Sequence, residues 1–233
     1  QRLQQQDGIV PLTRLHVLQR RPVAGLHRCV DLAGFHRGGA VGGLVRGAAV
    51  FHPDRAAAAR EQQGNIDGAM AAFQQGLGVL KDDVSLRVGL AALHERQKDF
   101  DAAIGLYDEV LTLQGDNAIA TNNLAALLSD HRTDAESLAR AKELAAKLAP
   151  VQRPAIQDTV GWVHYRSGDY AKAVEVLEGV VNAAPKVPVF QYHLGMAYAK
   201  AGDKAKARTH LSQALELGDF AEAEEARKVL ESL

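Results

Sequence analysis

The residues of this sequence that could do chemistry are mainly histidines, tyrosines and a single tryptophan, and their spacing matches no catalytic pattern. The chain has no G-x-x-x-x-G-K-[ST] phosphate loop, no G-x-S-x-G nucleophile turn and no H-E-x-x-H zinc motif. An enzyme would need a nucleophile beside a base, or paired carboxylates, in a shared pocket. The sequence therefore predicts a chain that is not an enzyme and that takes no cofactor and no metal.

Three metal-ligand residue types do lie near the N-terminus, at His27, Cys29 and His36, but their spacing fits no standard zinc pattern. Cys29 is the only cysteine, so no internal disulfide can form. Residues 1–55 contain no Lys and no Glu and are rich in Arg, His and Gly. We leave 1–55 unassigned and interpret it as a disordered leader or a stretch read out of frame; a basic tail for an acidic partner is the alternative.

Composition and charge narrow the remaining classes of function. The chain is 47% hydrophobic but only 5% aromatic, which suits closely packed helices. Its net charge is −1, so no global field favours nucleic acid or a membrane surface. Residues 1–60 hold nine Arg and three Asp, which leaves −7 on the remainder.

The sequence also bears on the compartment. No apolar run approaches the roughly 18–20 residues that span a bilayer. The first residues lack the apolar core of a signal peptide, which favours the cytoplasm. Because the chain starts without Met, a lost leader would leave a periplasmic or membrane-associated location open.

The elements that must position the candidate side chains repeat with a period of 34 residues. A period of this length with alternating small and large residues indicates paired helices stacked in a solenoid, so the predicted fold class is all-α. The repeat is clearest where one set of residues recurs 34 positions later: Val160, Gly161, His164, Gly168, Asp169, Ala173 and Leu177 recur as Leu194, Gly195, Tyr198, Gly202, Asp203, Ala207 and Leu211.

The repeat divides the chain into successive helix pairs. Asn65, Asp99, Asp169 and Asp203 are predicted N-caps of second helices, and Thr133 begins a capping box. Lys98 stands in the turn where two later units have glycine. The units are a partial one at 56–83, complete ones at 84–117, 154–187 and 188–221, one with a four-residue insertion at 118–153, and a capping helix at 222–233.

The two ends of the array are predicted to differ. The last helix has Ala223, Ala226, Leu230 and Leu233 on one side, while its other side carries Glu222, Glu224, Glu225, Lys228 and Glu231 toward water. The partial first unit would leave Ile66, Met70 and Phe73 uncovered. An uncovered apolar face of this kind favours self-association through the N-terminal end.

The segments 158–170 and 193–203 resemble the first helix and turn of the tetratricopeptide repeat family, and the resemblance covers about 64–221. It implies antiparallel helix pairs that bind another protein or peptide on the concave side. The order of an inserted repeat, a repeat with Trp162 and a repeat with Gly195 is similar to bacterial members from exopolysaccharide and protein-export (PEP-CTERM-type) loci. The implied function is a non-catalytic interaction scaffold. The alternative is the C-terminal repeat portion of a larger export or exopolysaccharide-assembly protein or enzyme.

In this family the first helices of successive units line the concave groove, and helical spacing then identifies the residues that face a partner. The groove rows also include Glu95, Ala126 and Asp130. The predicted partner-binding residues are Asn122, Asn123, Asp158, Trp162, Tyr165, Arg166, Tyr192, His193, Met196 and Lys200.

Residue type supports this assignment but leaves alternatives open. Trp, Tyr and Arg dominate interface hot spots, although Trp162 could equally pack between units. The amides of Asn122 and Asn123 could hold a peptide backbone or face solvent. His94 and His164 share the column of Tyr198, so we expect them to be packing residues with a satisfied ring nitrogen.

One binding mode of the family is not expected here. Some members hold a chaperone's C-terminal carboxylate with Lys and Asn on successive first helices. Asn123 matches one such position, but Val88, Ala92, Ala155 and Thr159 stand where the other amide and basic groups would be. The sequence therefore predicts no chaperone-tail binding.

Overall fold

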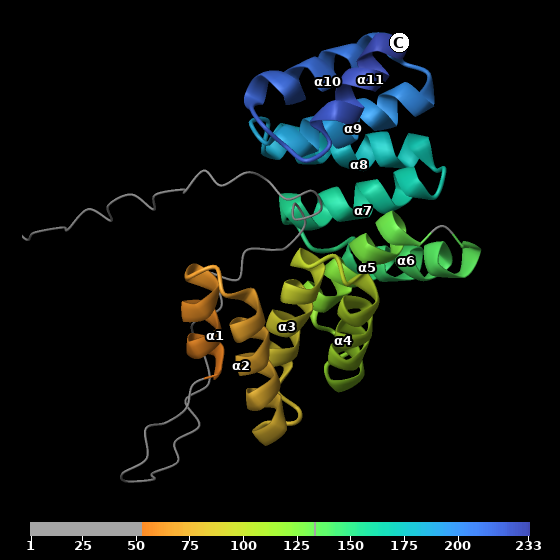
Figure 1. Ribbon diagram of the computed structural model, residues 1–233. Coiled ribbons are helices and arrows are strands. Elements are labelled where there is room, and N and C mark those ends of the chain that lie inside the picture. The colour runs from red at the N-terminus through yellow and green to blue at the C-terminus, as the bar shows by residue number, and fades with distance from the viewer. Residues whose placement is uncertain (1–52, 133) are drawn as a thin grey trace, which may run out of the picture.

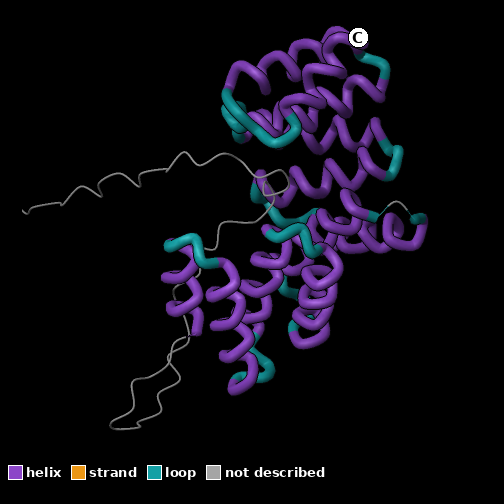
Figure 2. The backbone as a smooth tube through the Cα atoms, viewed as in Figure 1, coloured by secondary structure: helices purple, strands orange, loops and turns teal. Residues whose placement is uncertain are grey.

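The computed structural model describes residues 53–132 and 134–233, and this part of the chain is helical with no β-strand (Figures 1 and 2). His27, Cys29 and His36 and most of residues 1–55 lie outside the described residues. The helices are α1 (Pro53–Gln62), α2 (Ile66–Val79), α3 (Val84–Arg96), α4 (Phe100–Leu113), α5 (Ala118–His131), α6 (Ala135–Leu148), α7 (Pro154–Arg166), α8 (Tyr170–Ala183), α9 (Pro188–Ala201), α10 (Lys204–Leu217) and α11 (Ala223–Ser232).

The helices stack in chain order as antiparallel pairs, from α1 and α2 at one end to α9 and α10, with α11 covering the last pair (Figure 1). The second helix of each pair also contacts the first helix of the next pair. First helices contact one another in turn, as α5 with α7 and α7 with α9. The prediction of an all-α solenoid is confirmed. No helix among the described residues has the length and apolarity needed to cross a bilayer.

Short polar residues fix where the second helices begin. Asp99, Asp169 and Asp203 each accept a hydrogen bond from the backbone N–H three residues ahead, which satisfies one donor of the first turn. The cap of α6 is Asp134, whose side chain accepts from the Ser137 N–H at 2.8 Å. Thr133, predicted to begin this helix, lies outside the described residues. The first helices α7 and α9 instead start with proline at the first position.

The turns inside the pairs need a residue in the left-handed region. Gly168 and Gly202 have φ of 81° and 91°, and Gly64 has 75°. Lys98 adopts φ of 63° at the same place in its unit. A side chain there costs roughly 1–2 kcal/mol relative to glycine, so this unit keeps the turn geometry at the expense of local strain.

Small residues allow the two helices of a pair to cross closely. Ala173 and Ala207 are completely buried. A Cβ added at Gly161 would lie 2.6 Å from Leu177 Cγ, and one added at Gly195 would lie 2.7 Å from Leu211 Cγ. These positions have no room for a side chain, which explains why the clearest repeats hold glycine there.

The N-terminal unit has two helices where the sequence suggested only part of a unit. Ala57 of α1 is buried in a cluster with Ala69 and Ala72 of α2, and Ile66, Met70 and Phe73 pack partly buried against that cluster. The Phe73 ring also approaches Gly89 of α3 so closely that an added Cβ would lie 2.5 Å from it. The expectation of an uncovered face is therefore wrong, because α1 and α3 cover it. The argument for self-association through that face loses its basis.

Candidate functional site

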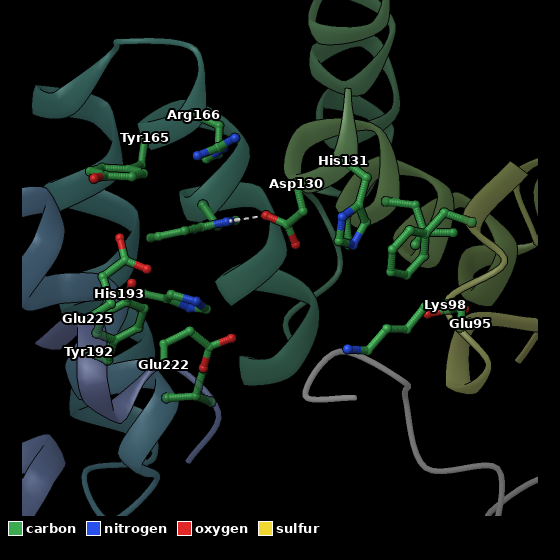
Figure 3. A pocket seen from close by; sticks show the side chains of 15 residues that line it. Glu95, Lys98, Asp130, His131, Tyr165, Arg166, Tyr192, His193, Glu222 and Glu225 are labelled. Carbon is green, nitrogen blue, oxygen red and sulfur yellow. Dashed lines mark hydrogen bonds between the residues drawn. The ribbon is translucent and has the colours of Figure 1, made fainter. Parts of the chain in front are cut away.

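A pocket of about 390 Å³ opens on the side of the array formed by first helices. Side chains from α3, α5, α7, α9 and α11, from the α3–α4 turn, from the start of α4 and from the residue before α11 converge on it (Figure 3). The lining residues are Glu95, Lys98, Phe100, Ala126, Leu127, Asp130, His131, Trp162, Tyr165, Arg166, Val189, Tyr192, His193, Glu222 and Glu225.

Aromatic rings form one wall of the pocket. The Trp162 ring stacks on Tyr165, with centroids 4.5 Å apart, and contacts the His193 ring at 4.1 Å. Tyr192 follows at 6.0 Å from Trp162, and its ring also lies 5.5 Å from both His193 and Phe220. Figure 3 shows Tyr165 and His193 on either side of the indole, whose bond to Asp130 is dashed. The wall thus joins α7, α9 and the segment before α11.

Buried hydrogen bonds hold this wall in place. The indole N–H of Trp162 donates to Asp130 Oδ1 at 2.7 Å, which links α7 to α5. Behind the indole, His193 Nδ1 lies 2.7 Å from Asp158 Oδ1, and both side chains are at most 3% exposed. Polar groups buried this deeply must be paired to be tolerated, so the His193–Asp158 contact fixes α9 against α7.

A second chain of hydrogen bonds supports the opposite side. Asn122 Nδ2 donates to Asn123 Oδ1 at 3.1 Å, and Asn123 Nδ2 donates to the Tyr107 hydroxyl at 2.8 Å. The Tyr107 hydroxyl in turn donates to Glu95 Oε1 at 2.5 Å. The two asparagines, only 1% and 4% exposed, therefore act beneath the surface to orient a carboxylate that lines the pocket.

Charge in the pocket is mostly negative. Four carboxylates line it against two cations, Lys98 and Arg166. Arg166 is held at the rim because its Nε donates to the Ser129 carbonyl at 2.8 Å. Burial raises the pKa of Tyr165 to about 12, with a further contribution from the Glu225 carboxylate. Burial and then Glu225 also raise the pKa of Tyr192, so both phenols stay protonated at neutral pH.

Comparison with known proteins identifies the architecture. A family model described as tetratricopeptide repeat matches residues 55–118 and 161–222, more than half of the chain. The chain belongs to the tetratricopeptide repeat family. The unmatched interval contains most of the unit with the four-residue insertion, so the model skips the unit that departs most from the 34-residue period. The family and fold imply a protein–protein interaction scaffold, and tetratricopeptide proteins are generally non-catalytic.

One curated relative is the "TPR repeat-containing protein PA4667" of Pseudomonas aeruginosa, which is 32% identical over 142 residues. The match covers 60% of this chain but only 23% of that protein, so the chain spans less than a quarter of its length. Neither this relative nor the similar structures are named for an exopolysaccharide or protein-export locus, so that narrower resemblance gains no support.

Solved tetratricopeptide structures share the fold. MamA of Desulfovibrio magneticus RS-1 has a TM-score of 0.61 at 17% identity, over 71% of this chain and 92% of that one. A thermophilic TPR protein of Thermus thermophilus has 0.58 at 18%, over 77% and 96%. A tetratricopeptide repeat protein of Parabacteroides merdae has 0.65 at 13%, over 77% and 70%. At these identities the likeness establishes the fold alone.

The structure brings together half of the residues predicted to bind a partner. Trp162, Tyr165, Arg166, Tyr192 and His193 line the pocket.

The other five do not line the pocket. Asn122, Asn123, Asp158 and Met196 are buried beneath it, and Lys200 is exposed outside its lining. The interpretation of the asparagine pair as a solvated face or an exposed peptide clamp is therefore wrong, because both side chains are buried and Asn123 donates to Tyr107 of α4.

Sequence reasoning did not assign two glutamates of the capping segment to the pocket. Glu222 and Glu225 were assigned to the water-facing side of the capping segment, and Glu225 is indeed exposed while Glu222 is half-buried. Both also line the pocket, which the sequence did not predict. Their spacing of three residues puts them on one helix face, adjacent to the buried Ala226, and that signal could have found them. Lys98, in the turn before α4, and Phe100, the first residue of α4, also line the pocket and were not predicted.

His94 and His164, which align with Tyr198 in the repeat, pack within the array, but only His94 has the hydrogen-bond partner expected for its ring nitrogen. His94 Nδ1 lies 2.9 Å from Asp99 Oδ2. His164 Nδ1 lies 3.5 Å from Asp169 Oδ2 and makes no hydrogen bond, so the expectation of a satisfied nitrogen is wrong there. Burial lowers the pKa of His164, which favours the neutral ring. Among residues 53–132 and 134–233, no group of His, Cys, Asp and Glu is arranged to hold a metal ion.

Proposed function

We propose that this chain is a non-catalytic scaffold that holds an extended or helical segment of another protein in the pocket between α3, α5, α7, α9 and α11. Membership of the tetratricopeptide family supports the general role. The pocket supports the location, because ligand sites are concave, apolar in their walls and furnished with a few convergent polar groups.

The observation that carries this proposal is the aromatic wall with its polar rim. Trp162, Tyr165 and Tyr192 are residue types that supply most of the binding energy in protein interfaces. They are held rigidly by stacking and by the Trp162–Asp130 hydrogen bond, so a partner would pay little entropy to order them. Trp162 itself is only 7% exposed, and we assign it both a packing role and an edge presented to the partner.

The residues below the pocket have a supporting role in this proposal. Asn122, Asn123 and Asp158 orient Glu95 and His193 from beneath, and Met196 fills the core behind the wall. Lys200 lies outside the lining and would meet only the flank of a longer segment.

The test is selection of binding peptides from an unbiased display library by the full chain, followed by affinity measurement on two variants. Glu225→Phe places a bulky group at the pocket mouth, while Glu224→Phe changes the adjacent, exposed residue of α11 that does not line the pocket. Both variants lose one negative charge and gain the same ring. We expect the selected peptides to bind Glu225→Phe at least about tenfold more weakly and Glu224→Phe as well as the unchanged chain.

Two outcomes would overturn the proposal. One is a library that yields no binder to the full chain. The other is a set of binders that Glu225→Phe and Glu224→Phe bind equally well.

A second candidate is that the chain functions as the repeat portion of a larger bacterial protein, an export or exopolysaccharide-assembly protein among them. The matched relative favours it, since the match covers only 23% of that protein. The gene sequence on either side of this stretch would test it: further repeats or a catalytic domain in the same reading frame support it, and stop codons at both ends contradict it.

A further inference from the structure

We propose that residues 20–46 of this chain dock in its own pocket, so that a partner segment must displace them in order to bind. Residues 20–46 lie outside the described part of the chain. A basic tail for an acidic partner is the alternative interpretation of residues 1–55, and we identify the pocket as that partner. The inference rests on the proposed scaffold function and adds its regulation, because the chain then carries its own competitor for the site.

The N-terminal segment joins the helical array within reach of the pocket. Pro53, the first residue of α1, lies beside Leu86 of α3, because a Cβ added at Gly76 would lie 2.6 Å from the one side chain and 2.8 Å from the other. From Leu86 to Glu95, which lines the pocket, α3 rises about 14 Å. The stretch from Arg46 to Pro53 can span roughly 23 Å when extended, so residues 20–46 can reach the pocket.

Covalent attachment means that weak contacts are sufficient for docking. A segment joined by a short tether is presented to its site at an effective concentration on the order of millimolar. A segment that would bind as a separate peptide with a dissociation constant of about 0.1 mM would then fill the site roughly ten times as often as it leaves it empty. The apparent dissociation constant of a competing partner would rise by about the same factor.

The segment and the helical array carry opposite net charge. Residues 20–46 hold five Arg and one Asp, and residues 1–52 as a whole carry +5. Because the whole chain carries −1, residues 53–233 carry −6. The pocket follows the sign of the array, since four carboxylates and two cations line it. This complementarity favours docking of the segment on the pocket side over its release into solvent.

Apolar side chains supply a second contribution, which charge alone would not give. Between its arginines the segment carries residues such as Leu26 and Phe35. The lining of the pocket includes Ala126, Leu127 and Val189 beside the aromatic wall. Arginine itself pairs with carboxylates and also packs on aromatic rings. A segment that mixes arginine with apolar residues therefore matches a pocket that mixes carboxylates with apolar and aromatic side chains.

Cys29 and Trp162 provide the test, because each is the only residue of its type in the chain. A nitroxide spin label is attached to Cys29 of the full chain, and the Trp162 indole N–H resonance is recorded by NMR before and after the label is reduced. We expect the active label to broaden this resonance and to leave the backbone N–H of Ala205, an exposed residue of α10 outside the pocket, unchanged. No broadening at Trp162, or equal broadening at Ala205, would overturn the proposal.

A mixed sample shows whether the contact is made within one chain. Spin-labelled chain of natural isotope content is added to ¹⁵N-labelled chain that carries no spin label. We expect the Trp162 resonance of the ¹⁵N-labelled chain to keep its intensity. Broadening as strong as in the singly prepared sample would mean that the segment docks on a second copy, and docking within the chain would be refuted.

Charge-matched variants connect this contact to partner binding. The test variant combines Arg20→Gln, Arg21→Gln, Arg28→Gln, Arg37→Gln and Arg46→Gln. The control removes the same charge from exposed residues outside the pocket and combines Lys81→Gln, Lys142→Gln, Lys147→Gln, Lys186→Gln and Arg208→Gln. We expect the test variant to lose the broadening at Trp162 and to bind a library-selected peptide about tenfold more tightly, while the control changes neither. Equal peptide affinity in the two variants would contradict competition within the chain.

Failure of this inference can be told apart from failure of the scaffold function. If selected peptides bind in the pocket while the label on Cys29 leaves the Trp162 resonance unchanged, the scaffold function stands and docking of residues 20–46 falls. If the label broadens that resonance but the library yields no binder to the full chain or to the test variant, docking stands and the scaffold function falls.

Discussion

The N-terminal helices α1–α4 and the C-terminal helices α7–α11 share one backbone plan but use it differently. The core shared by α1, α2 and α3 is built on Ala57, Ala69, Ala72 and Leu93, and the first buried aromatic residue along the described chain is Tyr107 of α4. The core at the other end contains six buried aromatic residues, namely Trp162, Tyr165, Phe190, Tyr192, Tyr198 and Phe220. The helix pair is thus the same backbone scaffold in every unit. The size of its side chains determines whether a unit only packs against its neighbours or also lines the pocket.

The N-terminal and C-terminal units also differ in the residue at one aligned position of their first helices. Val88, Asn122, Asp158 and Tyr192 occupy equivalent positions in four successive units. The first is apolar, the next two carry buried polar networks, and the last is part of the aromatic wall. A buried polar network costs stability unless it is fully paired, so its presence under the pocket points to positioning rather than stabilisation.

The largest expected change in the free energy of unfolding comes from comparing substitutions in the cores at the two ends of the array. Leu211→Ala removes a fully buried side chain beside Gly195 and should lower the free energy of unfolding by about 3 kcal/mol. Met70→Ala, at the partly buried N-terminal cluster, should cost about 1 kcal/mol. Urea unfolding followed by circular dichroism, with hydrogen exchange to locate the opening, measures both. Equal losses would mean that the two cores are packed alike.

The next effect concerns the buried pair beneath the indole. Asp158→Ala leaves His193 without its partner and should cost about 2–3 kcal/mol in the same unfolding measurement. Asp158→Asn keeps an acceptor and should cost about half as much. A loss for Asp158→Ala no greater than that for Asp158→Asn would show that the pair does not stabilise the α7–α9 contact.

A smaller change in the free energy of unfolding is expected at the turns inside the helix pairs, where one unit has Lys98 and another has Gly202. Lys98→Gly relieves a left-handed side chain and should raise the free energy of unfolding by about 1 kcal/mol. The reciprocal Gly202→Lys should lower it by a similar amount. If thermal unfolding shows no change for either variant, the Lys98 turn carries no strain and the two units are equivalent there.

The smallest expected effect is a loss of folding stability at alkaline pH, and it concerns the C-terminal helices with the buried aromatic residues. The folded-state pKa of Tyr165, about 12, lies above the ordinary value of 10, so the folded state holds this proton more tightly. Its contribution to stability is complete below pH 10 and is lost as pH rises from 10 toward 12. Urea unfolding at pH 9 and pH 11 should therefore show a smaller alkaline loss for Tyr165→Phe than for the unchanged chain; an equal loss would contradict the shift.

The sequence predicted the solenoid of helix pairs because each pair depends on interactions between residues close together in the chain. Gly168, Asp169, Ala173 and their counterparts act within one helix pair, so their 34-residue recurrence was enough to predict the solenoid.

The pocket could be predicted only in part because it is assembled from distant units. Trp162 and Tyr192 follow from helical spacing, but the burial of Asn122 depends on how other helices pack around α5. Whether the exposed Glu225 also lines the pocket depends on where α11 docks, which no repeat pattern encodes.

The central claim is that a partner segment docks in this pocket, and the most direct test is the Trp162 indole N–H resonance during titration with a peptide selected by the full chain. We predict that this resonance shifts and saturates with the same dissociation constant that an independent affinity measurement gives. A peptide that binds the full chain while the Trp162 resonance stays in place would contradict the account.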